Sequence, residues 1–289
     1  MMLFGFLGLV ALATGIVSGG ELMQEVNVRD WGVTETGDQT DRINEIIAAN
    51  KGRTIFFPTG AYHVHSIVVN NDIVLKGAGK ETILLFAGEQ SSAPVLDVRK
   101  GNVTVRDLTI DGNARSGIGI YICDYFNAGY RITIENCIVR DIYGNRTSGG
   151  YGIQVNRNSS QVNIVNTLIS DIGGPEDGIE GNRVGANRGI YLNNVSSVMV
   201  SGCTIDRVKG YEDGDGIQYL RWDGKNARNV IIRQNLFRNI YKRAIKIQAD
   251  NATISDNRIY GEWNPRHANY AAISIYGNNN TVDNNKIIL

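Results

Sequence analysis

The charged residues with the most regular spacing lie beside a short motif that recurs along the chain. Arg188, Asp215 and Arg243 each come directly before a Gly-Ile or Ala-Ile pair, and Lys246 directly follows one such pair. Two guanidinium groups can bind and neutralise a carboxylate, and a neutral lysine amine can accept a proton. Asp213 and Asp215 are an alternative pair of carboxylates for acid–base chemistry. These five residues are the first candidates for a catalytic site.

The motif also predicts which side chains lie beside them. If each motif Ile points into a core, the next residue points outward, because side chains alternate along a strand. That outward position holds Gly119, Gln154, Tyr191, Gln218, Lys246 and Ser274, and the position two residues further on holds Tyr121, Asn156, Asn193, Leu220, Gln248 and Tyr276. The position before the motif holds Ser116, Tyr151, Arg188, Asp215, Arg243 and Ala271. With strands ~4.8 Å apart, we expect an Arg188–Asp215–Arg243 ladder with Lys246 alongside. Tyr219 would point inward.

Aromatic residues mark a further column at the mouths of the preceding loops. This column consists of Ala114, Tyr143, Gly173, Lys209, Tyr241 and Trp263. Exposed aromatic faces pack against sugar rings. Tyr143, Tyr241 and Trp263 are therefore candidate substrate-binding residues. Tyr191, Gln218, Gln248 and Asp213 complete the predicted binding set.

Each of these features also has a purely structural interpretation. The arginine–aspartate ladder can be a structural ion-pair stack. Lys246 can be a solvated surface lysine, and the aromatic residues can simply cover loop backbone. Convergence of cations, a carboxylate, amides and aromatics on one face favours function.

The elements that position these residues form a repeat. Two kinds of apolar run alternate from residue 100 onward, and each returns after roughly 22 to 37 residues. Strands that stack on their own kind without intervening helices form a parallel β-helix. Asn136, Asn166, Asn235 and Asn257 recur where the chain must bend, and Asn tolerates the left-handed conformation of such bends. A leucine-rich-repeat solenoid lacks support because no helical segment falls between the strands.

The N-terminal part has two further features. Residues 2–17 are apolar and uncharged, as in an export signal, although no Lys or Arg precedes them. Residues 1–20 are therefore predicted to be a signal peptide or an apolar anchor, and residues 21–289 a single β-helix domain. The protein is expected to be secreted or to belong to the cell envelope. Ile43, Ile46 and Ile47 fall on one side of a short amphipathic helix, with Asp38 as its N-cap. This helix is expected to cover the open end of the coil.

Composition narrows the classes of partner. The 29 Lys and Arg balance the 29 Asp and Glu, which argues against nucleic acid as the main partner. The three cysteines, Cys123, Cys137 and Cys203, lack metal-site spacing and are predicted to be small buried residues. No cofactor is expected. The acidic loops at 175–177 and 211–213 leave calcium open, without a ligand motif to support it.

Residues 26–113 contain short sequence motifs that resemble those of a known superfamily. They include Asp30-Trp31-Gly32, Phe56–Tyr62, Leu75–Gly79 and Arg106–Asn113. Over this stretch the chain resembles the pectate-lyase-3 and rhamnogalacturonase/epimerase-like proteins, a pectin-lyase-like superfamily; beyond it, the repeat pattern alone carries the likeness. The resemblance implies an all-β, right-handed parallel β-helix and action on acidic polysaccharides. It does not extend to specific activities, since the superfamily includes lyases, hydrolases, epimerases and tailspikes.

Two active sites of similar proteins are not matched. Where mannuronan C5-epimerases carry an Asp and a His, this chain has Gln154 and Asn156 in the segment Tyr151–Asn156. The Gly-His-Gly of polygalacturonases is missing between Asp213-Gly214-Asp215 and Arg243–Lys246. Both assignments are therefore rejected.

The residues predict action on an acidic polysaccharide by β-elimination. Arg188 and Arg243 would neutralise the uronate carboxylate, and Lys246 would remove the C5 proton. Two alternatives stay open: hydrolysis by Asp213 and Asp215, and a non-catalytic glycan-binding or tailspike-like module. The chain ends in an apolar strand at residues 284–289. We therefore expect this end to be covered by another copy in a homo-oligomer, or the chain to be a shortened form of a longer one.

Overall fold

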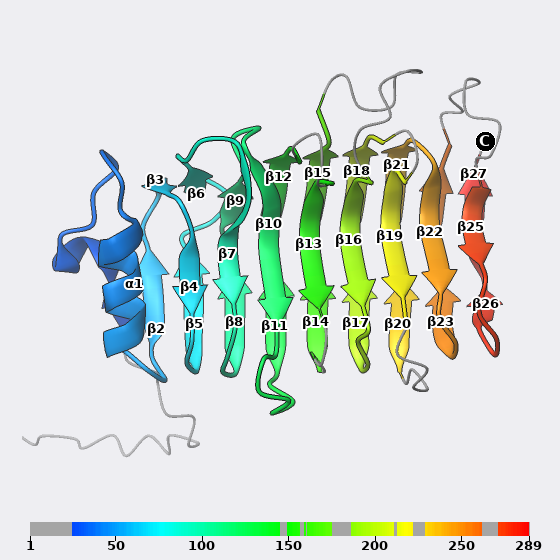
Figure 1. Cartoon of the computed structure of the whole chain (residues 1–289), viewed down its shortest axis with the longest axis horizontal. Coiled ribbons are helices and arrows are strands. Elements are labelled where there is room, and N and C mark those ends of the chain that lie inside the picture. The colour runs from blue at the N-terminus through cyan, green and yellow to red at the C-terminus, as the bar shows by residue number, and fades with distance from the viewer. Residues whose placement is uncertain are drawn as a thin grey trace, which may run out of the picture.

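The computed structural model describes residues 25–144, 149–156, 159, 161–174, 186–210, 213–221, 229–261 and 271–288. These residues form a coil of stacked turns with three parallel sheets (Figure 1), in which each strand pairs with the strand one turn away. Sheets A, B and C contain 10, 9 and 8 strands. The all-β parallel β-helix expected from the repeat is confirmed.

The strands follow one another in the order sheet A, sheet B, sheet C within each turn. Sheet A consists of β1 (Glu25–Asn27), β2 (Thr54–Phe57), β5 (Ile73–Gly77), β8 (Val103–Arg106), β11 (Ile132–Glu135), β14 (Val162–Val165), β17 (Val198–Ser201), β20 (Val230–Arg233), β23 (Ala252–Ser255) and β26 (Thr281–Asp283). Sheet B consists of β3 (Gly60–Val64), β6 (Thr82–Phe86), β9 (Thr109–Asp111), β12 (Ile138–Ile142), β15 (Leu168–Ile172), β18 (Thr204–Val208), β21 (Leu236–Ile240), β24 (Arg258–Tyr260) and β27 (Lys286–Ile288). Sheet C consists of β4 (Ile67–Val69), β7 (Ser91–Val98), β10 (Ser116–Cys123), β13 (Tyr151–Asn156), β16 (Arg188–Asn193), β19 (Asp215–Leu220), β22 (Arg243–Gln248) and β25 (Ala271–Ile275).

The bend between sheets A and B is held by a ladder of buried asparagines. Gln234 takes up a left-handed conformation, with a φ of 56°, and turns the chain. Asn235 then points inward, where its amide donates to Asn257 Oδ1 at 3.0 Å. Asn257 in turn donates to Asn285 Oδ1 at 2.8 Å. The stretch of residues 230–240 is thus divided between β20 of sheet A and β21 of sheet B, and the Asn235 side chain satisfies backbone groups at this corner.

The N-terminal end of the coil is covered by a helix. The helix α1 (Thr40–Ala49) buries Ile43, Ile46 and Ile47 and lies across that end in Figure 1. A short 3-10 helix, Val28–Trp31, precedes it. The expected lid is therefore present, with one correction at its start. The N-cap residue is Gln39, while the Asp38 carboxylate accepts from the Thr40 amide at 2.9 Å.

The core runs through all the described turns between the three sheets. Ile, Val and Leu side chains fill it, and Tyr219 is fully buried, as the alternation predicts. The cysteines at 123, 137 and 203 are buried, as expected, and none of them is in a disulfide within the described part of the chain. None of the described helices is long and apolar enough to cross a membrane.

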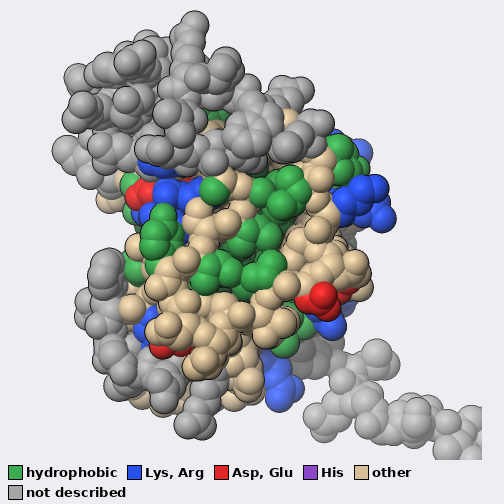
Figure 2. All heavy atoms as spheres, turned by 90° about the vertical axis from the view of Figure 1, so that its right-hand side faces the viewer, with side chains coloured by type: hydrophobic (Ala, Val, Ile, Leu, Met, Phe, Trp, Pro, Cys, Tyr) green, Lys and Arg blue, Asp and Glu red, His purple; other side chains and the backbone are tan. Residues whose placement is uncertain are grey.

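The last turn has its apolar side chains open to solvent. Ile275, Tyr276, Val282 and Ile287 are 38%, 66%, 46% and 48% exposed. Figure 2, which faces this end, shows apolar side chains gathered in its centre.

Candidate functional site

The outer face of sheet C carries the predicted columns. Arg188, Asp215 and Arg243 are direct neighbours in the strand register. In the next outward column Tyr191 pairs with Gln218, and Gln218 with Lys246. The alternation of side chains is therefore sufficient to place these residues on one face.

The register in the first of these turns differs from the prediction. Gln154 lies beside Tyr121, and Tyr151 beside Ile118, whereas Gly119 and Ser116 were expected at these places. The reason is that Ile120, not Ile118, is the buried side chain that aligns with Ile153. An irregularity in the pairing of β10 with β7 accompanies this two-residue shift.

The charged residues converge into one group, which we call the charged cluster: Arg188, Asp213, Asp215, Arg243 and Lys246. Asp213 is its centre. Arg188 Nη2 lies 3.1 Å from Asp213 Oδ2, and Lys246 Nζ lies 2.8 Å from Asp213 Oδ1. Arg243 Nη2 also donates to Asp213 Oδ1.

The expected Arg188–Asp215–Arg243 ladder is therefore only half correct. Arg243 holds Asp215 through Nε at 2.6 Å and Nη2 at 3.1 Å, but Arg188 turns to Asp213 instead. The position of Asp213 depends on Gly214, because a Cβ there would lie 2.8 Å from the carbonyl oxygen of Gly210. A glycine thus lets the loop approach closely enough to bring a second carboxylate to the cations.

Burial makes these charges strong partners. The side chains of Arg188, Arg243 and Lys246 are only 9%, 9% and 10% exposed, whereas Asp213 is 26% exposed and Asp215 is 0% exposed. Asp213 is therefore the carboxylate of the cluster that faces solvent. Lys246 is not a freely solvated surface lysine.

The two carboxyl groups titrate in opposite directions. Burial raises the pKa of Asp215, and the hydrogen bond and charge of Arg243 offset this only in part. Burial also acts to raise the pKa of Asp213, but the Lys246 hydrogen bond and the charges of Arg188, Lys246 and Arg243 outweigh it, so that this pKa lies below 3.8. Asp213 is therefore ionised at neutral pH.

Aromatic and amide side chains border the charged cluster on one side. Arg188 lies 4.8 Å from the ring centre of Tyr191 and 5.6 Å from that of Tyr151. The two rings stack at 5.4 Å. Gln218 accepts from Arg188 Nε and donates to Gln248 Oε1 at 2.6 Å. Burial raises the pKa of Tyr191, which keeps its phenol protonated.

The remaining predicted residues have different outcomes. Tyr241 is half-buried and lies beside Gly214, 3.0 Å from where a Cβ would stand, at the margin of the cluster. Tyr143 is half-buried and lies three turns before Tyr241, after β12. Trp263 lies outside the described residues, as do 175–177 and 211–212 of the acidic loops. The described residues contain no group of acidic, His or Cys side chains that could hold a metal ion.

Tyr151 is the residue that the sequence reasoning missed. It stood in the predicted column beside Arg188, but it was not assigned a role. Its stacking against Tyr191 and its contact with Arg188 place it in the site. The signal was available, because Tyr151 and Arg188 occupy the same position relative to the motif in consecutive turns.

The fold and this face define a class: a parallel β-helix with a cation-lined polar site on one sheet. The chain belongs to the family described as the right handed beta helix region, whose model matches residues 99–287. The pectin-lyase-like superfamily expected from the sequence is thereby confirmed at the level of the fold. No curated protein matches the chain significantly.

Solved structures share this fold. ORF18 of Geobacillus virus E2 is similar over 82% of this chain and 53% of its own, with 18% identity and a TM-score of 0.56. An alginate lyase from Paenibacillus sp. str. FPU-7 is similar over 92% and 99%, with 14% identity and a TM-score of 0.54. The catalytic unit of a GH87 alpha-1,3-glucanase from Streptomyces thermodiastaticus is similar over 94% and 48%, with 18% identity and a TM-score of 0.52. The chain thus spans about half the length of the first and third of these proteins.

Proposed function

We propose that this protein is carbohydrate-active and cleaves an acidic polysaccharide by β-elimination on the outer face of sheet C. The observation that carries the proposal is the convergence of three buried cations on the single carboxylate of Asp213. Solved structures that share this fold include an alginate lyase and an exopolygalacturonase, enzymes named for polysaccharide substrates. We further propose a secreted or cell-envelope location, on the basis of the apolar leader.

The charged cluster has the composition of a carboxylate receptor. Three cations face two carboxylates, and Arg243 already neutralises the fully buried Asp215. Arg188, Lys246 and the second interaction of Arg243 are then directed at Asp213. A uronate carboxylate has the same shape and charge as the Asp213 side chain. We infer that Asp213 stands in for the substrate carboxylate and leaves when a uronate binds.

The residues can then perform an elimination. Arg188 and Arg243 would neutralise the uronate carboxylate and so acidify the C5 proton. Lys246, once its own proton has passed to solvent, would accept the C5 proton. The C5–H electrons would form the C4–C5 double bond as the C4–O bond breaks, and the leaving oxygen would take a proton from the Tyr191 phenol or from water. The products are one fragment with a new reducing end and one fragment that begins with an unsaturated uronate.

Burial disfavours the hydrolytic alternative. Hydrolysis needs two carboxyl groups that reach the sugar, one as an acid and the other as a base or nucleophile. The opposite pKa shifts of Asp213 and Asp215 fit such a division. However, Asp215 is 0% exposed, and Arg243 binds both of its oxygens. Asp215 is therefore positioned to hold Arg243, not to contact a sugar.

Asp213→Asn tests the stand-in role. Removing the competing negative charge should tighten the binding of uronate oligosaccharides about five- to tenfold, because the three cations keep their positions. Titration calorimetry with trigalacturonate and trimannuronate measures this. Glu81→Gln is the matched control, since Glu81 is 68% exposed and far from the site in sequence and turn. Equal or weaker binding by Asp213→Asn would show that Asp213 itself belongs to the binding surface.

We also propose that a second copy of the chain covers the C-terminal end. The support is the open apolar end face formed by Ile275, Tyr276, Val282 and Ile287. A two-fold contact would bury the same surface on both copies. Ile287→Glu places a charge in that contact and should shift the protein to monomers in sedimentation velocity. A wild-type protein that stays monomeric at all concentrations, with no change in Ile287→Glu, would overturn this proposal.

A further inference from the structure

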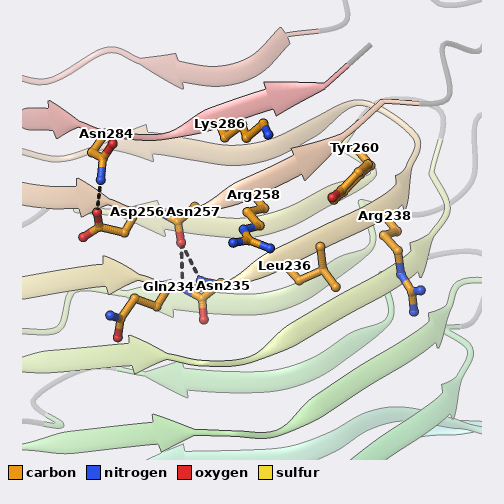
Figure 3. Close-up of a pocket in the computed structure, with 10 residues that line it drawn as sticks. All are labelled: Gln234, Asn235, Leu236, Arg238, Asp256, Asn257, Arg258, Tyr260, Asn284 and Lys286. Atoms are coloured by element: carbon orange, nitrogen blue, oxygen red, sulfur yellow. Dashed lines mark hydrogen bonds between the residues drawn. The ribbon is translucent and has the colours of Figure 1, made fainter.

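A groove of about 900 Å³ lies on a different part of the surface, along the bend between sheets A and B. Figure 3 shows it with its side chains. Its cations and its tyrosine come from sheet B, whereas Asp256 and the amides come from the corner. The residues that matter most are Leu236, Arg238, Asp256, Arg258, Tyr260 and Lys286.

The arginines on the earlier turns of sheet B are paired. Arg140 Nε lies 2.8 Å from Asp111, Arg207 Nε lies 2.6 Å from Asp171, and Arg238 Nη2 lies 3.2 Å from Asp206. Each outward cation on these turns thus has a carboxylate on a neighbouring turn.

Arg238, which also lines the groove, is the last of these paired arginines. Arg258 and Lys286 are exposed direct register neighbours. Within the described part of the chain, neither makes an ion pair with a carboxylate. Asp256, the acidic residue lining the groove, accepts from the Asn284 amide instead. Like charges that face each other in register destabilise a sheet. An anionic ligand bound between Arg258 and Lys286 would offset their mutual repulsion.

The rest of the lining suits a sugar. Tyr260 is 39% exposed and lies near Arg258 in Figure 3. Its ring offers a face for the C–H surface of a pyranose. Gln234 and Asn284 at the corner add amides that can bond hydroxyl groups. Aromatic, amide and unpaired cation are thus combined in one groove.

We propose that this groove is a second binding site, which holds an anionic polysaccharide with its carboxylate or sulfate groups on Arg258 and Lys286 and a sugar ring on Tyr260. It shares with the proposed function only the class of ligand. Arg258, Lys286 and Tyr260 belong to sheet B and are separate from the charged cluster on sheet C. The groove would hold one part of the polysaccharide on the protein surface while another part of the same polysaccharide is bound at the charged cluster.

Calorimetry with trigalacturonate on the full chain tests the proposal. We expect two molecules bound per chain in the wild type and one in the double variant Arg258→Gln/Lys286→Gln. For long polygalacturonate, the double variant should bind about tenfold more weakly and with less dependence on salt, since each exposed ion pair is worth a few-fold in affinity. The charge-matched control is Lys51→Gln/Lys80→Gln, whose side chains are 71% and 76% exposed and should have no effect.

Further ligands and variants show which chemical group of the polysaccharide the groove binds and whether it binds independently of sheet C. Dextran sulfate in place of polygalacturonate distinguishes sulfate from carboxylate groups, and neutral dextran should not bind at the groove. A sheet C variant such as Arg188→Gln should lose the other molecule and keep this one, so that failure of the proposed function leaves the groove testable. Unchanged stoichiometry and affinity in the double variant would overturn the proposal. A change in sedimentation in place of polysaccharide binding would also overturn it, because the groove would then contact a second copy.

Discussion

Lys246→Ala is expected to abolish formation of unsaturated, ultraviolet-absorbing product from a uronate polymer. A general base contributes about 10²–10⁴-fold to a rate, and Lys246 Nζ lies 2.8 Å from Asp213 Oδ1, the place proposed for the substrate carboxylate. The fold should persist, because Arg188 and Arg243 still hold Asp213. The measurement is initial rate on polymers screened from pectate, alginate and bacterial exopolysaccharides, with thermal unfolding as a check on folding.

Lys246→Arg separates the proton-accepting role from the charge. Arginine keeps a positive charge but stays protonated at neutral pH. This variant should therefore bind substrate and fail to turn it over. If Lys246→Arg retains the wild-type rate, Lys246 supplies only charge. Binding without any cleavage in the wild type would identify a glycan-binding module, and new reducing ends without ultraviolet absorbance would identify a hydrolase.

Arg243→Met is expected to lower the free energy of unfolding by about 3–5 kcal/mol at pH 7, since removing one partner of a buried ion pair leaves the other charge uncompensated. Asp215 would be that charge, because its side chain is 0% exposed and Arg243 binds both of its oxygens. Urea unfolding measures the loss. It should exceed the effect of replacing any exposed arginine of sheet B.

The pH dependence of this loss has a definite sign. The folded-state pKa of Asp215 is raised above 3.8, so that its contribution to stability is fully present below pH 3.8 and is lost as the pH rises through its folded value. The penalty of Arg243→Met should therefore be smaller near pH 4 than at pH 7. A penalty that does not change with pH would show that lost packing, not the Asp215 charge, causes it.

Asp215→Asn completes the comparison. Combined with Arg243→Met, it should restore most of the stability, because the buried charge is then removed. Alone, it should weaken substrate binding modestly if the reaction is an elimination. On the hydrolytic alternative it should cost orders of magnitude in rate. One kinetic measurement distinguishes these two outcomes.

The sequence by itself determined the architecture and the face that carries the site. Side chains alternate along a strand and like strands stack at a fixed spacing, so that the repeated motif was enough to align Arg188, Asp215 and Arg243, and Tyr191, Gln218 and Lys246. The asparagines at 235 and 257 likewise marked a corner. Such features depend on local periodicity, which a linear sequence displays directly.

Only the tertiary structure decided which charges meet. Asp213 lies outside the strand, so the alternation of side chains does not predict where its carboxylate points. Its central place in the charged cluster depends on Gly214, which allows a close approach to Gly210. The shifted register of β10 arises because Ile120, and not Ile118, is the isoleucine buried in the core beside Ile153. Arg258 and Lys286, which make no ion pair with the described residues, stand out only in comparison with the paired arginines of earlier turns. Ion pairs and core packing are set by distances between side chains on different turns, and those distances exist only once the coil has formed.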